Sequence, residues 1–185
     1  GKLLAVLQKA DTSDNDRVTA CQNLGWCGTK TAVAPLAALL AHEKPVLRHA
    51  ARYGLEMIPD PAVEQAFCEA AGRLTGPALV GVLQSMGNRG NAQSVALLSA
   101  RLSDPDKSVA AAAAQALGKR ATPEALAALK AGLGKCPGAA AAYLNGAGRI
   151  AAAHASYDHR GNTLSTESAC GRCRPYPCIW ADWCR

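Results

Sequence analysis

The sequence predicts an all-α solenoid of stacked helical hairpins, and three observations lead to that fold class. Hydrophobic residues make up 49% of the chain but aromatic residues only 4%, so Ala, Leu and Val dominate the apolar content. Alanine favours helices because it loses no side-chain entropy there. Apolar residues also recur at a spacing of 31 positions, with Gly, Asp-Pro and Thr-Pro between them.

Four apolar columns keep the 31-residue spacing through four units. They are Ala20, Ala51, Val82 and Ala113; Leu24, Leu55, Met86 and Leu117; Leu36, Phe67, Leu98 and Leu129; and Leu40, Ala71, Leu102 and Leu133. Residues four apart share one face of a helix, which pairs the first column with the second and the third with the fourth. Each unit is therefore a predicted helical hairpin. One hairpin cannot cover its own apolar face, whereas stacked hairpins can.

Turn chemistry gives the expected helix boundaries. The first helices are expected at 17–25, 46–57, 78–87 and 108–118, and the second helices at 31–41, 60–74, 92–102 and 122–133. Thr122 before Pro123, and Asp60 before Pro61, predict an N-cap followed by proline at the start of a second helix. A glycine is expected to end three of the first helices, at Gly25, Gly87 and Gly118.

The run DPDKSVAAAAAQALGKRATPEALAALKAGL, at 104–133, resembles a HEAT repeat of the short type found in relatives of phycobilisome lyases. The shared features are Asp-Pro before the first helix, Val109, Ala-Leu-Gly at 116–118 and Pro-Glu-Ala at 123–125. The resemblance covers about 18–133 and is weakest around Glu56, which replaces the glycine. It implies a bacterial HEAT-repeat scaffold that binds another protein or an adjacent domain, without catalytic residues or a cofactor.

The same resemblance implies that the chain is part of a longer protein, in a family whose members are often exported. At the start, Leu3 and Leu7 match Leu36 and Leu40, so a second helix of a preceding unit is expected there. The net charge of +6 is scattered along the chain, which favours an acidic partner over nucleic acid. No apolar run reaches the roughly 18 residues of a membrane span.

Two other functions stay open at this point. The repeat type implies an enzyme of the bilin lyase or isomerase type as one alternative. That enzyme would need reactive side chains on the second helices, where Ala34, Ala38 and Ala127 stand instead. The other alternative is a HEAT-like solenoid that binds nucleic acid, which would need a basic groove with aromatic platforms.

A polar strip on the second unit is the predicted partner-binding site. Arg48, Arg52 and Glu56 recur every four residues on one face of the 46–57 helix, and Tyr53 stands beside them. Tyr and Arg are frequent anchors in protein interfaces. An ion pair between Arg52 and Glu56, four residues apart, is expected on this face. A merely solvated helix face is the alternative interpretation.

Two histidine-containing segments resemble the iron-binding His-Glu pairs of HEAT-type deoxyhypusine hydroxylases. His42 is followed by Glu43, but it lies at a joint between units, and His49 is followed by Ala50. The chain has only four histidines, too few for repeated pairs on neighbouring helices. No metal site, cofactor site or catalytic residue is therefore expected.

The cysteines before residue 137 are expected to be structural. Cys21 and Cys68 lie inside predicted helices, where a free thiol behaves as a small buried hydrophobe. Cys27 lies in a predicted turn next to Trp26, which is expected to plug that turn. A Cys21–Cys27 disulfide is an alternative that would need an oxidising compartment.

A change of composition divides the chain into a solenoid at 1–155 and a tail at 156–185. A fifth first helix is expected at 138–154, with Leu144 and Gly148 in the columns, but the next positions are Arg160 and Leu164. The tail carries four cysteines, Cys170, Cys173, Cys178 and Cys184. Their spacing does not fit a zinc ribbon. Zinc, disulfides and a segment without packed structure stay open, and the last is preferred. A frameshift product is one hypothesis for such a segment, and a native tail is the other.

Overall fold

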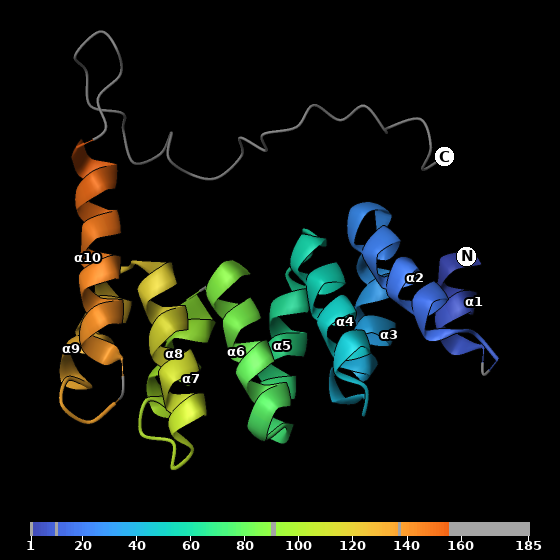
Figure 1. The fold of residues 1–185 in the computed structure, drawn as a ribbon. Coiled ribbons are helices and arrows are strands. Elements are labelled where there is room, and N and C mark those ends of the chain that lie inside the picture. Colours follow the sequence, from blue (N-terminus) through green and yellow to red (C-terminus); the bar gives the residue numbers. More distant parts are fainter. Residues whose placement is uncertain (1, 10, 90–91, 137, 156–185) are drawn as a thin grey trace, which may run out of the picture.

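The computed structural model describes residues 2–9, 11–89, 92–136 and 138–155, which form a two-layered stack of α-helices without a β-strand in that part of the chain. Figure 1 shows the first helices of the units side by side in front of the second helices. The first-helix layer contains α2 (Asp14–Cys27), α4 (Pro45–Met57), α6 (Gly76–Arg89), α8 (Lys107–Arg120) and α10 (Ala139–Ala155). The second-helix layer contains α1 (Lys2–Gln8), α3 (Lys30–Ala38) with the 3-10 helix η1 (Leu39–Ala41), α5 (Ala62–Arg73), α7 (Ala92–Arg101) and α9 (Pro123–Ala131). The predicted α-solenoid is confirmed.

Side-chain caps explain where several helices begin. The hydroxyl of Ser13 accepts a hydrogen bond from the backbone N–H of Asp16 at the start of α2. The carboxylate of Asp106 does the same for the N–H of Ser108 at the start of α8. Thr122 caps α9 through the N–H of Ala125, as its position before a proline predicts. Each cap satisfies a backbone donor that has no partner inside its helix.

The predicted core is buried. Eight large residues from two of the columns are at most 6% exposed: Leu24, Leu55, Met86, Leu117, Leu36, Phe67, Leu98 and Leu129. They belong to one continuous cluster that runs from α2 to α9. The 31-residue spacing therefore places a large apolar side chain at the equivalent position of each unit, where it packs in the core.

The column glycines do not end the first helices, which corrects one prediction. The helices α2, α6 and α8 each continue two residues past their glycine. A Cβ on Gly87 would lie 2.7 Å from the Cα of Ala116, and one on Gly118 would lie 2.6 Å from the carbonyl oxygen of Ala142. Glycine is needed there because the backbones of adjacent first helices come into contact.

The columns fail by one residue at the end of the stack, which corrects a second prediction. Leu133 and Leu144 belong to the predicted apolar columns, but they are 41% and 69% exposed. Gly132 is buried instead, and the buried positions of α10 lie 30 residues after their counterparts in α8, at Ala139, Ala142 and Gly146. One missing residue turns a helix by about 100°.

The two ends of the chain carry further predictions. At the start, α1 packs against α2 and α3, as expected for a second helix of a preceding unit. The predictions for the tail at 156–185, with its four cysteines, lie outside the described residues.

Candidate binding surface

Side chains of the first-helix layer form two rows along one face of the stack, and all of them are exposed except the half-buried Met57. The central row comprises Gln22, Tyr53, Gln84 and Gln115, and all four are exposed. The terminal row, near the C-terminal ends of the helices, comprises Trp26, Met57, Asn88 and Lys119. Both rows keep the 31-residue spacing. With the one-residue shift of α10, they continue as Asn145 and Arg149, which are also exposed.

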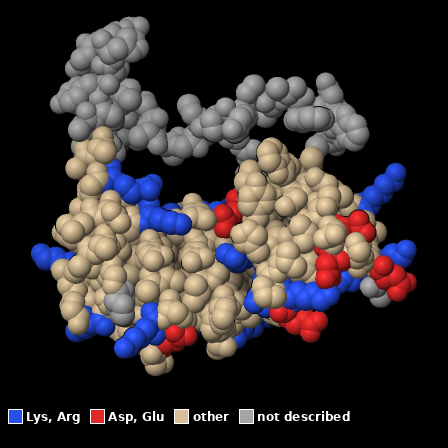
Figure 2. All heavy atoms as spheres, viewed as in Figure 1, with Lys and Arg blue, Asp and Glu red and all other residues tan. Residues whose placement is uncertain are grey.

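A shallow depression of about 390 Å³ crosses these rows between α4, α6 and α8. Each of the three helices contributes polar side chains to it. The lining residues are His49, Arg52, Tyr53 and Glu56 of α4, Gln84 and Asn88 of α6, and Gln115, Ala116 and Lys119 of α8. Figure 2 shows this face of the molecule, with Lys and Arg gathered over the upper parts of α8 and α10. The depression therefore belongs to three consecutive units rather than to one.

Hydrogen bonds link the three helices across the depression. The side-chain amide of Asn88 donates to the carboxylate of Glu56 at 2.9 Å, and the ammonium of Lys119 donates to the carbonyl of the same amide at 3.0 Å. Asn88 therefore bridges a negative and a positive side chain from the units on either side. These bonds hold three of the lining side chains in place.

Arg52 is built into the interface between α4 and α6. Its guanidinium donates to the carbonyl oxygen of Gly81 at 2.8 Å and reaches the hydroxyl of Ser85 at 3.5 Å. A Cβ on Gly81 would lie 2.7 Å from the guanidinium carbon, so the absence of a side chain there makes room for it. Burial lowers the pKa of Arg52 from its usual value.

The expected ion pair between Arg52 and Glu56 is not formed, because each side chain bonds to α6 instead. Two ion pairs elsewhere in the described chain are closer than 4.0 Å, one between Lys44 and Asp14 and one between Arg101 and Asp104. Attraction across four residues of one helix is weak, and bonds to the neighbouring helix replace it.

Arg48 has a different role from the one predicted for it. Its guanidinium donates to the carbonyl oxygens of His42 and Glu43, at 2.8 and 2.7 Å, and so holds the turn before α4. Of the four predicted binding residues, Arg52, Tyr53 and Glu56 line the depression, and Arg48 is not among its lining residues. Tyr53 is 39% exposed.

Residue-by-residue inspection of one helix missed the lining residues of α6 and α8. Gln84, Asn88, Gln115 and Lys119 lie in the same 31-residue register as Tyr53 and Met57. The spacing that identified the core would have identified these exposed rows if it had been followed for polar residues too.

Arg89 also escaped the sequence analysis, although it ties two units together. Its guanidinium donates to the carbonyl oxygens of Leu55, Glu56 and Ile58 and, at 3.3 Å, to that of Asp60. The last carbonyls of a helix have no partner inside the helix. Arg89 therefore caps the C-terminal end of α4 from α6.

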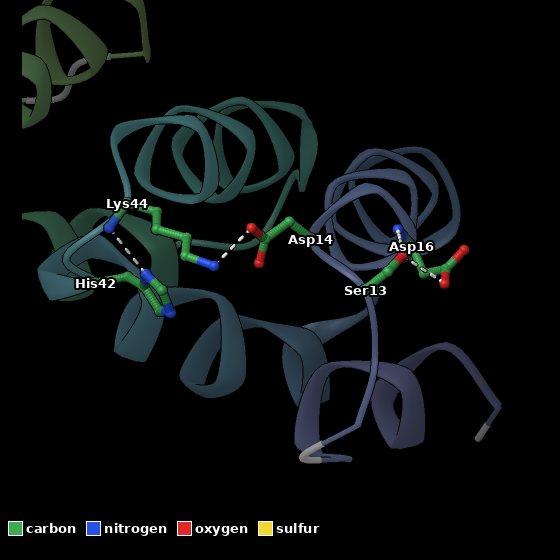
Figure 3. A network of polar contacts seen from close by, with 5 residues as sticks. All are labelled: Ser13, Asp14, Asp16, His42 and Lys44. Atoms are coloured by element: carbon green, nitrogen blue, oxygen red, sulfur yellow. Dashed lines mark hydrogen bonds and ion pairs between the residues drawn. The ribbon is translucent and has the colours of Figure 1, made fainter.

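The His42–Glu43 pair lies in a turn that other contacts already use. The Nδ1 atom of His42 accepts the backbone N–H of Lys44 at 3.1 Å, and the ammonium of Lys44 pairs with Asp14 at 2.7 Å (Figure 3). The hydrogen bond from Lys44 lowers the pKa of Asp14. Within the described part of the chain, no group of three His, Cys, Asp or Glu could hold a metal ion.

The first two cysteines have opposite environments. Cys21 is fully buried, as predicted, and burial raises the pKa of its thiol to about 11. Cys27 is the last residue of α2, rather than part of a turn, and is exposed. Cys21 forms no disulfide, so the alternative of a Cys21–Cys27 bridge is wrong. Trp26 does not plug a turn, because it lies in the last turn of α2 and is 63% exposed.

A family model for HEAT repeats matches residues 2–73 and 78–143. The chain belongs to the HEAT repeat family. The first match covers α1 to α5, and the second runs from α6 into α10, so the HEAT repeats coincide with the two-layered stack. A search of curated proteins gives no match. None of the described helices is long and apolar enough to cross a membrane.

Proposed function

We propose that this chain is a non-catalytic scaffold module that binds a protein through the outward face of its first-helix layer. The depression lined by α4, α6 and α8 carries this proposal, because it collects polar side chains from three consecutive units. A stack of repeats presents the same side-chain position at every step, and this makes an extended surface. An exposed aromatic side chain such as Tyr53 is typical of protein interfaces.

The chemistry of three of the four described thiols, all except the exposed Cys27, favours a scaffold over the alternative of an enzyme of the bilin lyase type. Burial raises the pKa values of Cys21, Cys68 and Cys136. A thiol reacts as the thiolate, so a raised pKa lowers its nucleophilicity at neutral pH. Membership of the short, phycobilisome-lyase type and a place within a larger, exported bacterial protein stay part of the proposal.

The arrangement of charge on the face favours a protein partner over nucleic acid. Glu56 lies in the depression, where its carboxylate would repel a phosphate backbone. Lys119, which lines the same depression, is joined to Glu56 through Asn88. A mixed surface of this kind suits a partner that offers both amide groups and a few charges.

A pair of photo-cross-linkers tests the proposed surface. A benzophenone amino acid is placed at Gln84 on the first-helix layer or, as the matched control, at Ala127 on the second-helix layer. Both positions are exposed and helical. In cells that express the chain, we expect discrete protein adducts from the Gln84 position and few from the Ala127 position. Adducts only from Ala127, or from neither, would contradict the proposal.

A double substitution then tests which side chains bind. Tyr53→Ala with Gln84→Ala should reduce capture of the cross-linked partner and leave the far-UV circular dichroism spectrum unchanged. Arg48 and Arg52 are unsuitable for this test, since their guanidinium groups bond to backbone carbonyls and a change in capture would not separate binding from packing. Gln65→Ala with Ala96→Ser, on the second-helix layer, is the control and should leave capture unaffected. Unchanged capture by Tyr53→Ala with Gln84→Ala would count against these residues.

A further inference from the structure

We infer that the first-helix face binds an extended peptide that carries an apolar anchor for Tyr53 and, about six to nine residues away, acidic side chains for Lys119 and Arg149. This inference rests on the proposed function and adds the conformation and the charge pattern of the partner. It is supported by two observations, the unpartnered amides in the central row and the uneven charge of the stack, and by the general spacing of packed helices.

The amides of the central row suit a peptide backbone. Among the residues that the structure describes, neither the Gln84 nor the Gln115 side chain has a hydrogen-bond partner. A side-chain amide offers both donors and an acceptor, as a peptide unit does. An extended segment leaves its backbone N–H and C=O groups without intramolecular partners. Gln84 and Gln115, on adjacent helices, can therefore bond to its backbone whatever its side chains are.

Charge defines one end of the proposed peptide site. Residues 2–73 contain eight Lys or Arg and eight Asp or Glu, whereas residues 74–155 contain eight Lys or Arg and three Asp or Glu. On the first-helix face this excess includes Lys119 in α8 and Arg149 in α10, which occupy equivalent places in the terminal row. Figure 2 shows basic side chains over the upper parts of these two helices. Acidic side chains of a peptide would be attracted to this end.

Tyr53 and Trp26 mark the opposite end of the same face. Tyr53 is 39% exposed and lines the depression, and Trp26 is 63% exposed in the terminal row of α2. Large exposed aromatic side chains are frequent anchors for apolar groups of a partner. The face therefore has an aromatic end over α2 and α4 and a basic end over α8 and α10.

The spacing of the helices fixes the spacing expected in the peptide. Packed helices lie about 8–10 Å apart, and an extended chain advances about 3.3 Å per residue, so a peptide passes one helix every three residues or so. Within the first-helix layer, Lys119 on α8 lies two helices beyond Tyr53 on α4, and Arg149 on α10 lies three helices beyond it. About six to nine residues therefore separate the apolar anchor from the acidic side chains.

Selection from a phage library of random peptides about 15 residues long, long enough to cross all five first helices, tests the inference. The full chain is the target, at moderate salt. We expect the selected peptides to share an aromatic or large aliphatic residue and one or more acidic residues about six to nine positions away. Selected peptides without that pattern would overturn the inference but leave the scaffold function standing.

Charge reversal supplies the matched comparison. Lys119→Glu with Arg149→Glu should lower the affinity of the chain for synthetic copies of the selected peptides by about tenfold or more. Lys130→Glu, on α9 of the second-helix layer, should change that affinity less than about twofold. Peptides in which Lys replaces the acidic residues should bind the reversed variant better than the original chain. Equal loss in both variants would overturn the inference. Failure to select any peptide, together with absence of adducts in the cross-linking experiment, would overturn the proposed function as well.

Discussion

The two layers of the stack differ in which residues pack between neighbouring units and in which residues are exposed. In the first-helix layer, glycine and alanine bring adjacent backbones into contact, while the outward rows carry amides, aromatic rings and charges. In the second-helix layer, the column that faces inward consists of large side chains. Its members are Leu36, Phe67, Leu98 and Leu129, all fully buried. Alanine is the commonest exposed residue of that layer, at Ala34, Ala38, Ala96, Ala100, Ala127 and Ala131, whereas α5 exposes Gln65, Glu69 and Arg73.

This difference indicates how the repeat creates a binding face. Because small residues let the first helices approach closely, their outward side chains come within hydrogen-bonding distance of the next unit, as Glu56, Asn88 and Lys119 do. The second helices pack less closely against one another, and the exposed alanines of α3, α7 and α9 offer a partner no polar side chains. The same 31-residue spacing thus serves packing in one layer and the arrangement of polar side chains in the other.

The largest expected effect is on the inward column of the second layer. Leu98→Ala should lower the free energy of unfolding by about 2–5 kcal/mol, because truncation of a buried leucine removes apolar contacts and leaves a cavity. Leu98 is fully buried, so the cavity would not open to solvent. Chemical denaturation measures the change. A stability equal to that of the original chain would mean that Leu98 does not hold the second layer.

A pair of glycine substitutions compares the two layers directly. Gly87→Ala should destabilise the protein by about 1–3 kcal/mol, because the new Cβ would press on the backbone of α8. Gly72→Ala, in α5, should raise stability by up to about 1 kcal/mol, since nothing lies within 4 Å of the new Cβ and alanine favours a helix. Thermal unfolding of both variants gives the comparison. Equal effects would contradict the close approach of α6 and α8.

Two arginines of the interface between α4 and α6 should differ in importance. Arg89→Met should cost about 1–2 kcal/mol, because it removes the donor that caps the last carbonyls of α4. Arg52→Met should cost less than about 1 kcal/mol, because the hydroxyl of Ser85 still donates to the carbonyl of Gly81. The midpoints of urea unfolding rank the two variants. The reverse order would show that Arg52 is the more important contact.

The last effect concerns pH and Cys21, on the inward face of α2. Its pKa is raised from 9.0 to about 11 by burial, so the folded state holds the proton more tightly than the unfolded state does. Its contribution to stability is therefore complete below pH 9 and is lost as the pH rises from about 9 to 11. Cys21→Ala should show a smaller fall in stability over that range. Parallel curves for both proteins would indicate that the thiol does not titrate as proposed.

The sequence predicted the fold and core well because each rests on a repeated local pattern. Leu24, Leu55, Met86 and Leu117 occupy one position of one helix, and burial at one unit implies burial at the next. The prediction failed where a single residue is missing after Leu129, because periodicity does not detect a shift that turns α10 by about 100°. A glycine near a helix end also fits two explanations, a C-cap and a close contact, and only the neighbouring helix decides between them.

The candidate site was predictable in part. Tyr53 and Glu56 were found through their residue types, and Gln84 and Lys119 follow from the 31-residue spacing once polar positions are included. The role of Arg52 was not predictable, because it depends on the space left by Gly81 on another helix. Such long-range pairs arise from packing and leave no local signal.

The most direct test of the binding face is a chemical-shift map of the isotopically labelled chain during titration with a selected peptide. The account predicts that the side-chain amides of Gln84 and Gln115 and the backbone amide of Tyr53 shift together, with saturation at one equivalent of peptide. The backbone amides of Ala96 and Ala127, on the exposed face of the second layer, should stay unchanged. Shifts concentrated at Ala96 and Ala127, with the first-helix face unaffected, would contradict it.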